Sequence, residues 1–318
     1  MRIAWIGFHE EGAAALEALL DSGAPIVAVI TLTEDKRARC SGALDFEPLC
    51  SRHKVPLLLV DDINATESVA LLRKLELDLL LVIGWSQILG SQALGCAKLG
   101  AIGAHASLLP HNRGRAPVNW AIIHGDTQTG NTLMWLSPEV DKGEIIDQRA
   151  IPILPYDTCQ TIYDKVAITN REMLCEVLPR LLRGERPGHA QPDDGGRLLP
   201  RRQPSDGQIE WAQPAKQVYD FIRAQTFPYP GAFSWLQGKC WTVWAAALLA
   251  DIETGPVRPG TVVGPLISPF AEASGQLVSC GQGMLALLKL QARPDGAMLE
   301  SYRLAEMEWA GRVWTNGG

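Results

Sequence analysis

The sequence lacks the marks of a membrane or secreted protein. It contains no run of about 18 apolar residues, which a membrane-spanning helix needs at minimum. Its first residues, Met1 to Gly7, lead directly into an apolar segment without the basic region and cleavage site of a secretory signal. We therefore expect a cytoplasmic protein with no membrane partner.

Two kinds of ligand motif are also missing. Gly7 follows the first apolar segment, but the residues up to Gly12 lack the G-x-G-x-x-G spacing that lets a backbone approach a dinucleotide pyrophosphate. The seven cysteines are scattered singly, with no C-x-x-C pair and no histidine at metal-ligand spacing. Neither a dinucleotide cofactor nor a metal centre is expected.

The chain also lacks an excess of basic residues. Its 29 Lys and Arg face 35 Asp and Glu, a formal net charge of −6, whereas proteins that bind polyanions usually present a basic face. Residues 204–318 carry 8 basic and 10 acidic residues, a net charge of −2. DNA is not expected as a partner, and tRNA is an unlikely one.

Short apolar segments alternate with amphipathic segments over the first 100 residues, a pattern that predicts strands and helices in turn. The expected strands are Arg2–Gly7, Pro25–Leu32, Pro56–Val60 and Leu77–Gly84, and the expected helices are Glu10–Leu20, Phe46–His53 and Glu67–Leu75. The alternation predicts an α/β fold with a mostly parallel, Rossmann-like sheet. In such sheets ligands bind in the loops at the carboxyl ends of the strands.

The second half of the chain has a different organisation. A long helix is expected over Ile162–Leu182, followed by a linker rich in Arg, Gly, Pro and Asp over residues 184–208. Beyond a helix near Pro214–Ala224, short strands separated by glycines predict a small β-barrel, similar to an OB-fold. These strands are Ala232–Leu236, Cys240–Leu249, Thr261–Val263, Gln276–Ser279 and Met284–Leu290. We therefore expect two domains, residues 1–183 and 209–318.

The densest polar and turn signals follow an expected strand at Ala101–Ala104. In order, they are His105-Ala106-Ser107-Leu108-Leu109-Pro110, Arg113-Gly114-Arg115-Ala116-Pro117, Trp120, Gly125, Thr129-Gly130 and Asp141-Lys142-Gly143. Their type, order and spacing resemble the signature of the 10-formyltetrahydrofolate-dependent formyltransferase family. Phe227 to Phe233 resembles the stretch that opens the second domain in its tRNA and sugar-nucleotide branches. The resemblance covers essentially the whole chain.

The resemblance implies a transferase that moves a formyl group from 10-formyltetrahydrofolate to a primary amine without a metal. Such a reaction needs a proton acceptor, and an imidazole beside a carboxylate serves near neutral pH. By resemblance, His105 handles protons or polarises the formyl group, and Asp141 positions the incoming amine and helps to deprotonate it. The residues implied in donor binding are Trp85, Ile88, Leu89, Ser107 and Val140.

One position departs from the family pattern. Two residues before His105, where the family usually carries asparagine as an oxyanion donor, the chain has Gly103. Loss of one such donor typically costs roughly a hundredfold to a thousandfold in rate. A water or a backbone N–H could compensate for it. Alternatively, Gly103 could indicate one-carbon transfer at another oxidation level, hydrolysis of the formylated folate, or a folate-binding protein without turnover.

The expected acceptor follows from the branch of the family that the chain resembles more. Residues 200–206 look closer to the sugar-nucleotide branch, which includes enzymes acting on a uridine-diphosphate amino-arabinose. An amino-sugar nucleotide or a natural-product amine is therefore expected, with methionyl-tRNA as the alternative.

Arginine suits a diphosphate because its planar fork binds phosphate oxygens in pairs. The candidate acceptor contacts are Arg113, Arg115, Arg201 and Arg202. The basic loop Lys36 to Arg39, where the tRNA branch contacts RNA, is flanked by acidic residues. The oligomeric state is left open.

Overall fold

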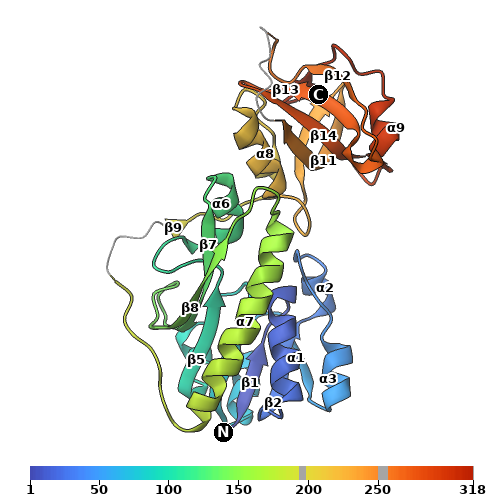
Figure 1. Cartoon of the computed structure of the whole chain (residues 1–318). Helices are drawn as coiled ribbons and strands as arrows, with labels where there is room; N and C mark the ends of the chain where they lie inside the picture. The colour runs from blue at the N-terminus through green and yellow to red at the C-terminus, as the bar shows by residue number, and fades with distance from the viewer. Residues whose placement is uncertain (193–197, 250–256, 318) are drawn as a thin grey trace. The chain divides into compact units, whose positions relative to one another are not determined.

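The computed structural model describes residues 1–192, 198–249 and 257–317, which form two compact units (Figure 1). The first unit comprises Met1–Pro117, Gln128–Pro152 and Ile162–Pro200, and the second comprises Val118–Thr127, Ile153–Thr161 and Arg201–Gly318. Two short segments from the middle of the chain therefore pack with the carboxy-terminal part. The expected domain boundaries stay a prediction, and residues 193–197 of the expected linker lie outside the described residues. None of the described helices is long and apolar enough to cross a membrane.

A seven-stranded sheet forms the centre of the first unit. Its strands are β1 Ile3–Ile6, β2 Ile26–Leu32, β3 Leu57–Val60, β4 Leu77–Val82, β5 Ala97–His105, β7 Gln128–Trp135 and β8 Ile145–Pro152. They lie in the order β3-β2-β1-β4-β5-β7-β8. The first five are parallel, and β7 and β8 add an antiparallel edge. The expected Rossmann-like sheet is confirmed, with His105 at the carboxyl end of β5.

Side chains on β1 alternate between the two faces of this sheet, as strand geometry requires. Ile3 and Trp5 are fully buried on the face covered by α1, α3 and α7, which Figure 1 shows in front of the sheet. Ala4 and Ile6 are fully buried on the opposite face, against α4 and α5. The helices of the first unit are η1 Glu10–Gly12, α1 Ala13–Asp21, α2 Glu34–Arg37, α3 Glu47–His53, α4 Thr66–Lys74, α5 Ser91–Leu94 and α7 Cys159–Leu182.

The second unit is built on an antiparallel sheet that curls into half a barrel. Its strands are β10 Ala232–Leu236, β11 Lys239–Leu249, β12 Val262–Leu266, β13 Gly275–Ser279, β14 Met284–Ala292, β15 Met298–Glu300 and β16 Trp314–Thr315. The main path runs β12-β13-β14-β11-β10-β16, and β15 pairs with β14. The remaining elements are α6 Pro117–Ile123, η2 Pro204–Gly207, α8 Ala215–Arg223, η3 Ala271–Ala273 and α9 Ser301–Ala305. The expected β-rich domain is confirmed.

The strand β7 shows why local pattern missed part of the sheet. Asn131 and Thr132 are fully buried polar residues inside it, which hides the alternation typical of a strand. The Asn131 amide donates hydrogen bonds to Thr169 and Asn170 of α7 at 3.0 and 2.7 Å. Buried polar groups are stable when they are hydrogen-bonded, and these partners lie almost 40 residues further along the chain.

A buried ion pair anchors α8 within the second unit. The Arg223 Nε donates to Asp220 Oδ1 at 2.8 Å, and both side chains are more than nine-tenths buried. Arg223 Nη1 also donates to the main-chain oxygens of Leu154 and Asp157. On its outer side, the Asp220 carboxylate pairs with the half-exposed Lys216. This pair therefore joins α8 to the segment Ile153–Thr161.

We expect Arg223→Ala to lower the free energy of unfolding by about 3 kcal/mol, because it leaves a buried carboxylate short of its main partner. The matched control is Lys216→Ala, which removes the exposed partner of the same carboxylate and should cost less than about 1 kcal/mol. Urea unfolding of the full chain, followed by tryptophan fluorescence, measures both changes. Equal losses in the two variants would contradict the anchoring role of the buried pair.

Candidate active site

His105 and Asp141 come together at one edge of the first unit. His105 is the last residue of β5, and Asp141 lies in the loop between β7 and β8. The His105 Nδ1 and Asp141 Oδ2 atoms are 3.7 Å apart, with side chains 9% and 16% exposed. The two residues that the resemblance predicted as catalytic are therefore neighbours, in a site that is largely shielded from water.

A main-chain oxygen selects the tautomer of the His105 ring. The His105 Nε2 lies 2.8 Å from the main-chain oxygen of Asn112. Because a carbonyl oxygen can only accept, Nε2 carries the hydrogen in this arrangement. In the neutral ring, Nδ1 then has the lone pair and faces the Asp141 carboxylate. The site can take up a proton at Nδ1 and stabilise the resulting positive charge with Asp141.

The Asp141 carboxylate is also held by a backbone amide. The Gly114 N–H donates to Asp141 Oδ2 at 2.8 Å. Asp141 and Asn112 both adopt left-handed backbone conformations, with φ values of 53° and 56°. Asp and Asn visit this region more readily than most residues, although it remains sparsely populated. Such backbone strain is typical of functional sites, where the surrounding structure has to maintain it.

Leu136 fills the space beside the glycine that departs from the family pattern. Gly103 is buried on β5, and a Cβ atom placed there would lie only 2.6 Å from Leu136 Cδ2. The Leu136 main chain is also fixed to β5, since its N–H donates to the Ala101 oxygen at 2.7 Å. An apolar side chain therefore occupies the place next to His105 where the family pattern predicts a polar amide.

The four arginines expected to contact the acceptor fall into two groups. In the first unit, Arg113 donates from Nε to the Asp141 main-chain oxygen at 3.3 Å and from Nη2 to Gln191 at 2.7 Å. Arg115 is exposed, and its guanidinium lies 3.4 Å from the Ser86 main-chain oxygen. Arg113 thus supports the Asp141 loop, whereas Arg115 reaches the loop that was expected to bind the donor.

The other two arginines belong to the second unit. Arg201 is exposed. The Arg202 guanidinium lies 4.9 Å from the ring centre of Trp120 and 5.6 Å from that of Phe221, and it donates to Gln225 at 2.9 Å. Burial lowers the pKa of Arg202, and the Asp206 carboxylate counteracts this shift. The stacking and hydrogen bonds of Arg202 hold parts of the second unit together, and its role in acceptor binding stays a prediction.

The loop expected to bind the donor offers both an apolar surface and backbone donors. Ile88 and Val140 expose 55% and 40% of their surface, so each offers an apolar contact surface. Within the described part of the chain, no hydrogen-bond acceptor is found for the main-chain N–H groups of Ser86, Ile88 and Leu89. A flat heterocycle such as a pterin has an apolar face and polar edges, so these groups fit it.

Two further residues predicted to bind the donor are engaged inside the protein. Trp85 packs edge-on against Phe8, with ring centres 5.8 Å apart. The Ser107 hydroxyl donates to the His111 main-chain oxygen at 2.8 Å, and Ser107 is 1% exposed. Both side chains shape the loops of the site, and their contact with a donor stays a prediction.

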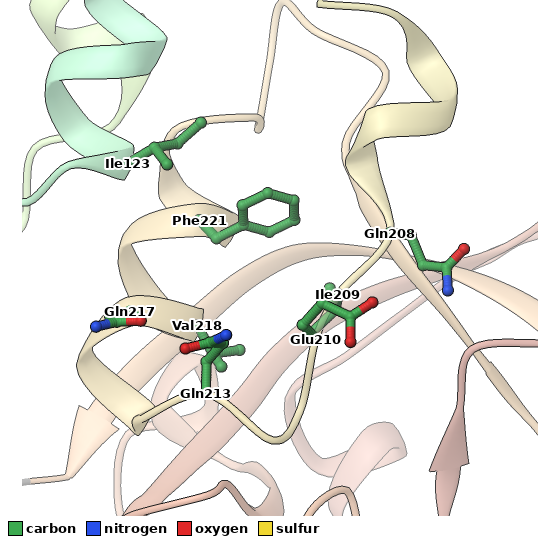
Figure 2. A pocket seen from close by; sticks show the side chains of 8 residues that line it. All are labelled: Ile123, Gln208, Ile209, Glu210, Gln213, Gln217, Val218 and Phe221. Carbon is green, nitrogen blue, oxygen red and sulfur yellow. The ribbon is translucent and has the colours of Figure 1, made fainter.

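A separate cavity of about 210 Å³ lies within the second unit (Figure 2). Its lining combines four apolar side chains with three glutamines and one glutamate: Ile123, Ile209, Val218, Phe221, Gln208, Gln213, Gln217 and Glu210. Glu210 and Gln208 are both hydrogen-bonded to Asn316. This lining offers no imidazole for proton transfer, so we place the chemistry at His105. No cluster of metal-ligating side chains occurs among the described residues.

Three residues of the site were not predicted. Asn112 fixes the ring of His105, Leu136 fills the space at Gly103, and Gln191 binds the Asp141 loop. Asn112 stands between two residues of the quoted motifs, but its contribution is a main-chain oxygen, which any residue has. Gln191 is 50 residues away from Asp141 in a segment expected to be a linker, so no local pattern indicates its contact.

Comparison with known proteins identifies similar chains over almost the full length. A formyl transferase family model matches residues 1–178, and a model of the formyl transferase C-terminal domain matches residues 202–301. A methionyl-tRNA formyltransferase of Symbiobacterium thermophilum is 35% identical over 93% of this chain and 89% of its own length. One from Geotalea uraniireducens is 32% identical over 96% of both chains.

Solved structures support the same fold. HypX from Aquifex aeolicus in complex with tetrahydrofolic acid has a TM-score of 0.66 at 18% identity, covering 96% of this chain and 47% of HypX. This chain therefore spans about half the length of HypX. WlaRD, a sugar 3N-formyl transferase, has a TM-score of 0.64 at 14% identity, covering 93% and 98% of the two chains.

These relatives correct one expectation. The low basic content of residues 204–318 led us to expect that tRNA is an unlikely partner. The curated relatives above are methionyl-tRNA formyltransferases, and a third, from Citrifermentans bemidjiense, is 32% identical over 96% of this chain. The expectation is therefore wrong, because the net charge of a domain does not report on where its basic residues lie.

We expect that Gly103→Asn in combination with Leu136→Ala raises the turnover of 10-formyltetrahydrofolate. The smaller side chain makes room for an amide that can donate to the developing oxyanion, and such a donor typically contributes roughly a hundredfold to a thousandfold. Gly103→Asn alone should gain less, since its side chain must first displace Leu136. Leu136→Ala alone is the control. Steady-state rates with the donor at saturation compare the three variants, and a double variant no faster than the wild type would show that the oxyanion is already fully stabilised.

Proposed function

Because the chain belongs to the formyltransferase family and uses 10-formyltetrahydrofolate, we propose that it transfers the formyl group to the amino group of methionyl-tRNA. The enzyme class and the donor expected from the sequence are confirmed. The acceptor is a proposal. It is supported by full-length relatives above 30% identity, in preference to the amino-sugar nucleotide that the sequence favoured. A tRNA acceptor agrees with the predicted cytoplasmic location.

The proposed chemistry depends on proton transfer at His105. When bound, 10-formyltetrahydrofolate supplies the formyl group. As the acceptor nitrogen forms its bond to the formyl carbon, it becomes positively charged and must lose a proton. The lone pair on His105 Nδ1 takes this proton, and the Asp141 carboxylate 3.7 Å away stabilises the imidazolium. The same nitrogen then returns the proton to the leaving nitrogen of the donor, so the ring ends in its original state.

The donor is proposed to lie against Ile88 and Val140, with its polar edges facing the free N–H groups of Ser86, Ile88 and Leu89. Backbone groups hold a ligand edge without adding flexible side chains, which lowers the entropy cost of binding. The exposed guanidinium of Arg115, which touches the Ser86 oxygen, can interact with an anionic part of either substrate.

Basic side chains for a tRNA acceptor are present near α2. Arg37 is paired with Asp45 at 3.2 Å. Lys36 and Arg39 are exposed, and within the described residues neither has an acidic partner. Free cations of this kind can neutralise phosphates and release counterions. We propose that Lys36 and Arg39 contribute to acceptor binding, while Arg37 stabilises the loop that presents them.

His105→Ala should lower kcat by at least about a hundredfold, the usual contribution of a positioned acid–base group. Binding of tetrahydrofolate, measured by isothermal titration calorimetry, should change little because the donor is proposed to contact backbone groups. Asp141→Asn should also lower kcat, since an amide cannot stabilise the imidazolium. Exposed His124→Ala is the control and should keep wild-type kinetics. Normal turnover in His105→Ala would move the chemistry elsewhere.

The acceptor proposal is tested with methionyl-tRNA, free methionine and a uridine-diphosphate amino-arabinose, each offered with 10-formyl or 5,10-methylene tetrahydrofolate. Mass spectrometry should find a formyl group on methionyl-tRNA, and only from the first donor. Lys36→Ala and Arg39→Ala should raise the KM for tRNA and lower the slope of log kcat/KM against log salt by about one each. Lys74→Ala, which removes an exposed charge on α4, is the control. Formylation of the amino sugar alone would refute the tRNA proposal.

A further inference from the structure

The segment between α7 and the second unit is bound to the proposed active site. We call residues Arg186 to Gln191 the linker strap. The Trp135 Nε1 donates to the Pro187 oxygen at 2.7 Å, and the main chains of His189 and Ile145 form a bridge with two hydrogen bonds of 2.8 and 2.9 Å. The strap therefore lies along the ends of β7 and β8, which enclose the Asp141 loop.

At the end of this strap, the side-chain amide of Gln191 makes three hydrogen bonds, and its partner Arg113 adds a fourth. Its Nε2 donates to the main-chain oxygens of Asp141 at 2.8 Å and Gly143 at 2.9 Å. Its Oε1 accepts from Arg113 Nη2 at 2.7 Å, and Arg113 Nε reaches the same Asp141 oxygen at 3.3 Å. An amide has two N–H donors and one oxygen acceptor, so a single glutamine satisfies all three partners.

The Gln191 hydrogen bonds hold the main chain of Asp141 in a strained conformation. Asp141 is held at a positive φ of 53°, a conformation that persists only where neighbouring groups impose it. The Gln191 bonds fix the main chain of this residue, and Gly114 fixes its carboxylate. Without the Gln191 bonds, the main chain of Asp141 is held only by Arg113 and its carboxylate by Gly114, so the 3.7 Å distance to His105 Nδ1 is less tightly fixed. A misplacement of about 1 Å at a reacting group can cost roughly a hundredfold in rate.

We propose that Gln191 is a positioning residue for formyl transfer: through the strained main chain of Asp141, it sets the distance between the Asp141 carboxylate and His105. This inference rests on the catalytic roles proposed above for those two residues. Gln191 touches neither of the reacting groups, so its effect has to pass through Asp141. The main-chain contacts of Pro187 and His189 hold the linker strap against β7 and β8, and so bring Gln191 to the Asp141 loop.

The test is a double-mutant cycle in the full chain with 10-formyltetrahydrofolate and whichever acceptor the wild type formylates. Gln191→Ala should lower kcat by about tenfold to a hundredfold, with less than about a threefold change in the KM of the donor. In the Asp141→Ala background, Gln191→Ala should leave the residual rate unchanged, because the group it positions is gone. His189→Ala, on the same strap but with an exposed side chain, is the matched control and should keep the wild-type rate.

Gln191→Glu distinguishes positioning from packing. It keeps the shape and the acceptor for Arg113 but loses both N–H donors, so we expect a loss of kcat as large as that of Gln191→Ala. Thermal unfolding within about 2 °C of the wild type would show that these variants fold. Rate losses of Gln191 and Asp141 variants that multiply, or a Gln191→Glu enzyme of normal rate, would overturn the positioning role. An Asp141→Ala enzyme of normal rate would instead refute the proposed function of the site.

Discussion

The turn at Asp141 is the constraint on which the proposed site depends. The carboxylate can approach His105 only if the chain after β7 reverses tightly, and this reversal requires Asp141 to adopt a positive φ. It also requires a glycine at position 143, since a Cβ atom there would lie 1.5 Å from the Trp135 oxygen. The spacing Asp141-Lys142-Gly143 in the motif thus has a steric cause. A side chain at position 143 would therefore displace the loop even with His105 and Asp141 unchanged.

The fold could be predicted from the sequence, and so could the pair His105 and Asp141, whose catalytic role stays a prediction. Much of the support around this pair could not be predicted. Apolar segments such as Leu77–Val82 indicate buried strands because burial on both faces leaves a continuous pattern. His105 and Asp141 belong to a motif whose spacing is set by local turns. Gln191 and Leu136 act through contacts that join distant segments, and their residue types are ordinary in isolation. Strand β7 is difficult to recognise in the sequence because it contains the polar residue Asn131, whose hydrogen-bond partners lie on α7.

Gly103 and Leu136 are best understood as a pair. With asparagine at position 103, the Leu136 side chain would have to move, and with glycine there the side chain of Leu136 closes the gap. Filling such a gap avoids a void whose lining atoms would lose packing contacts. The absence of the amide therefore does not leave a disordered site. It leaves an apolar side chain packed over Gly103, two residues before His105.

Binding of an RNA acceptor depends on where the basic side chains lie and not on the net charge of the chain. The negative total of residues 204–318 averages over surfaces that face different ways, and it omits the loop around α2 altogether. Within that loop, Asp45 neutralises Arg37 and leaves Lys36 and Arg39 available. Two free cations at a point of contact can contribute more to binding a phosphate than a modest excess spread over a domain, because screening limits each charge to a range of roughly 8 Å. An acidic protein can therefore bind an RNA wherever its ion pairs leave basic side chains unmatched.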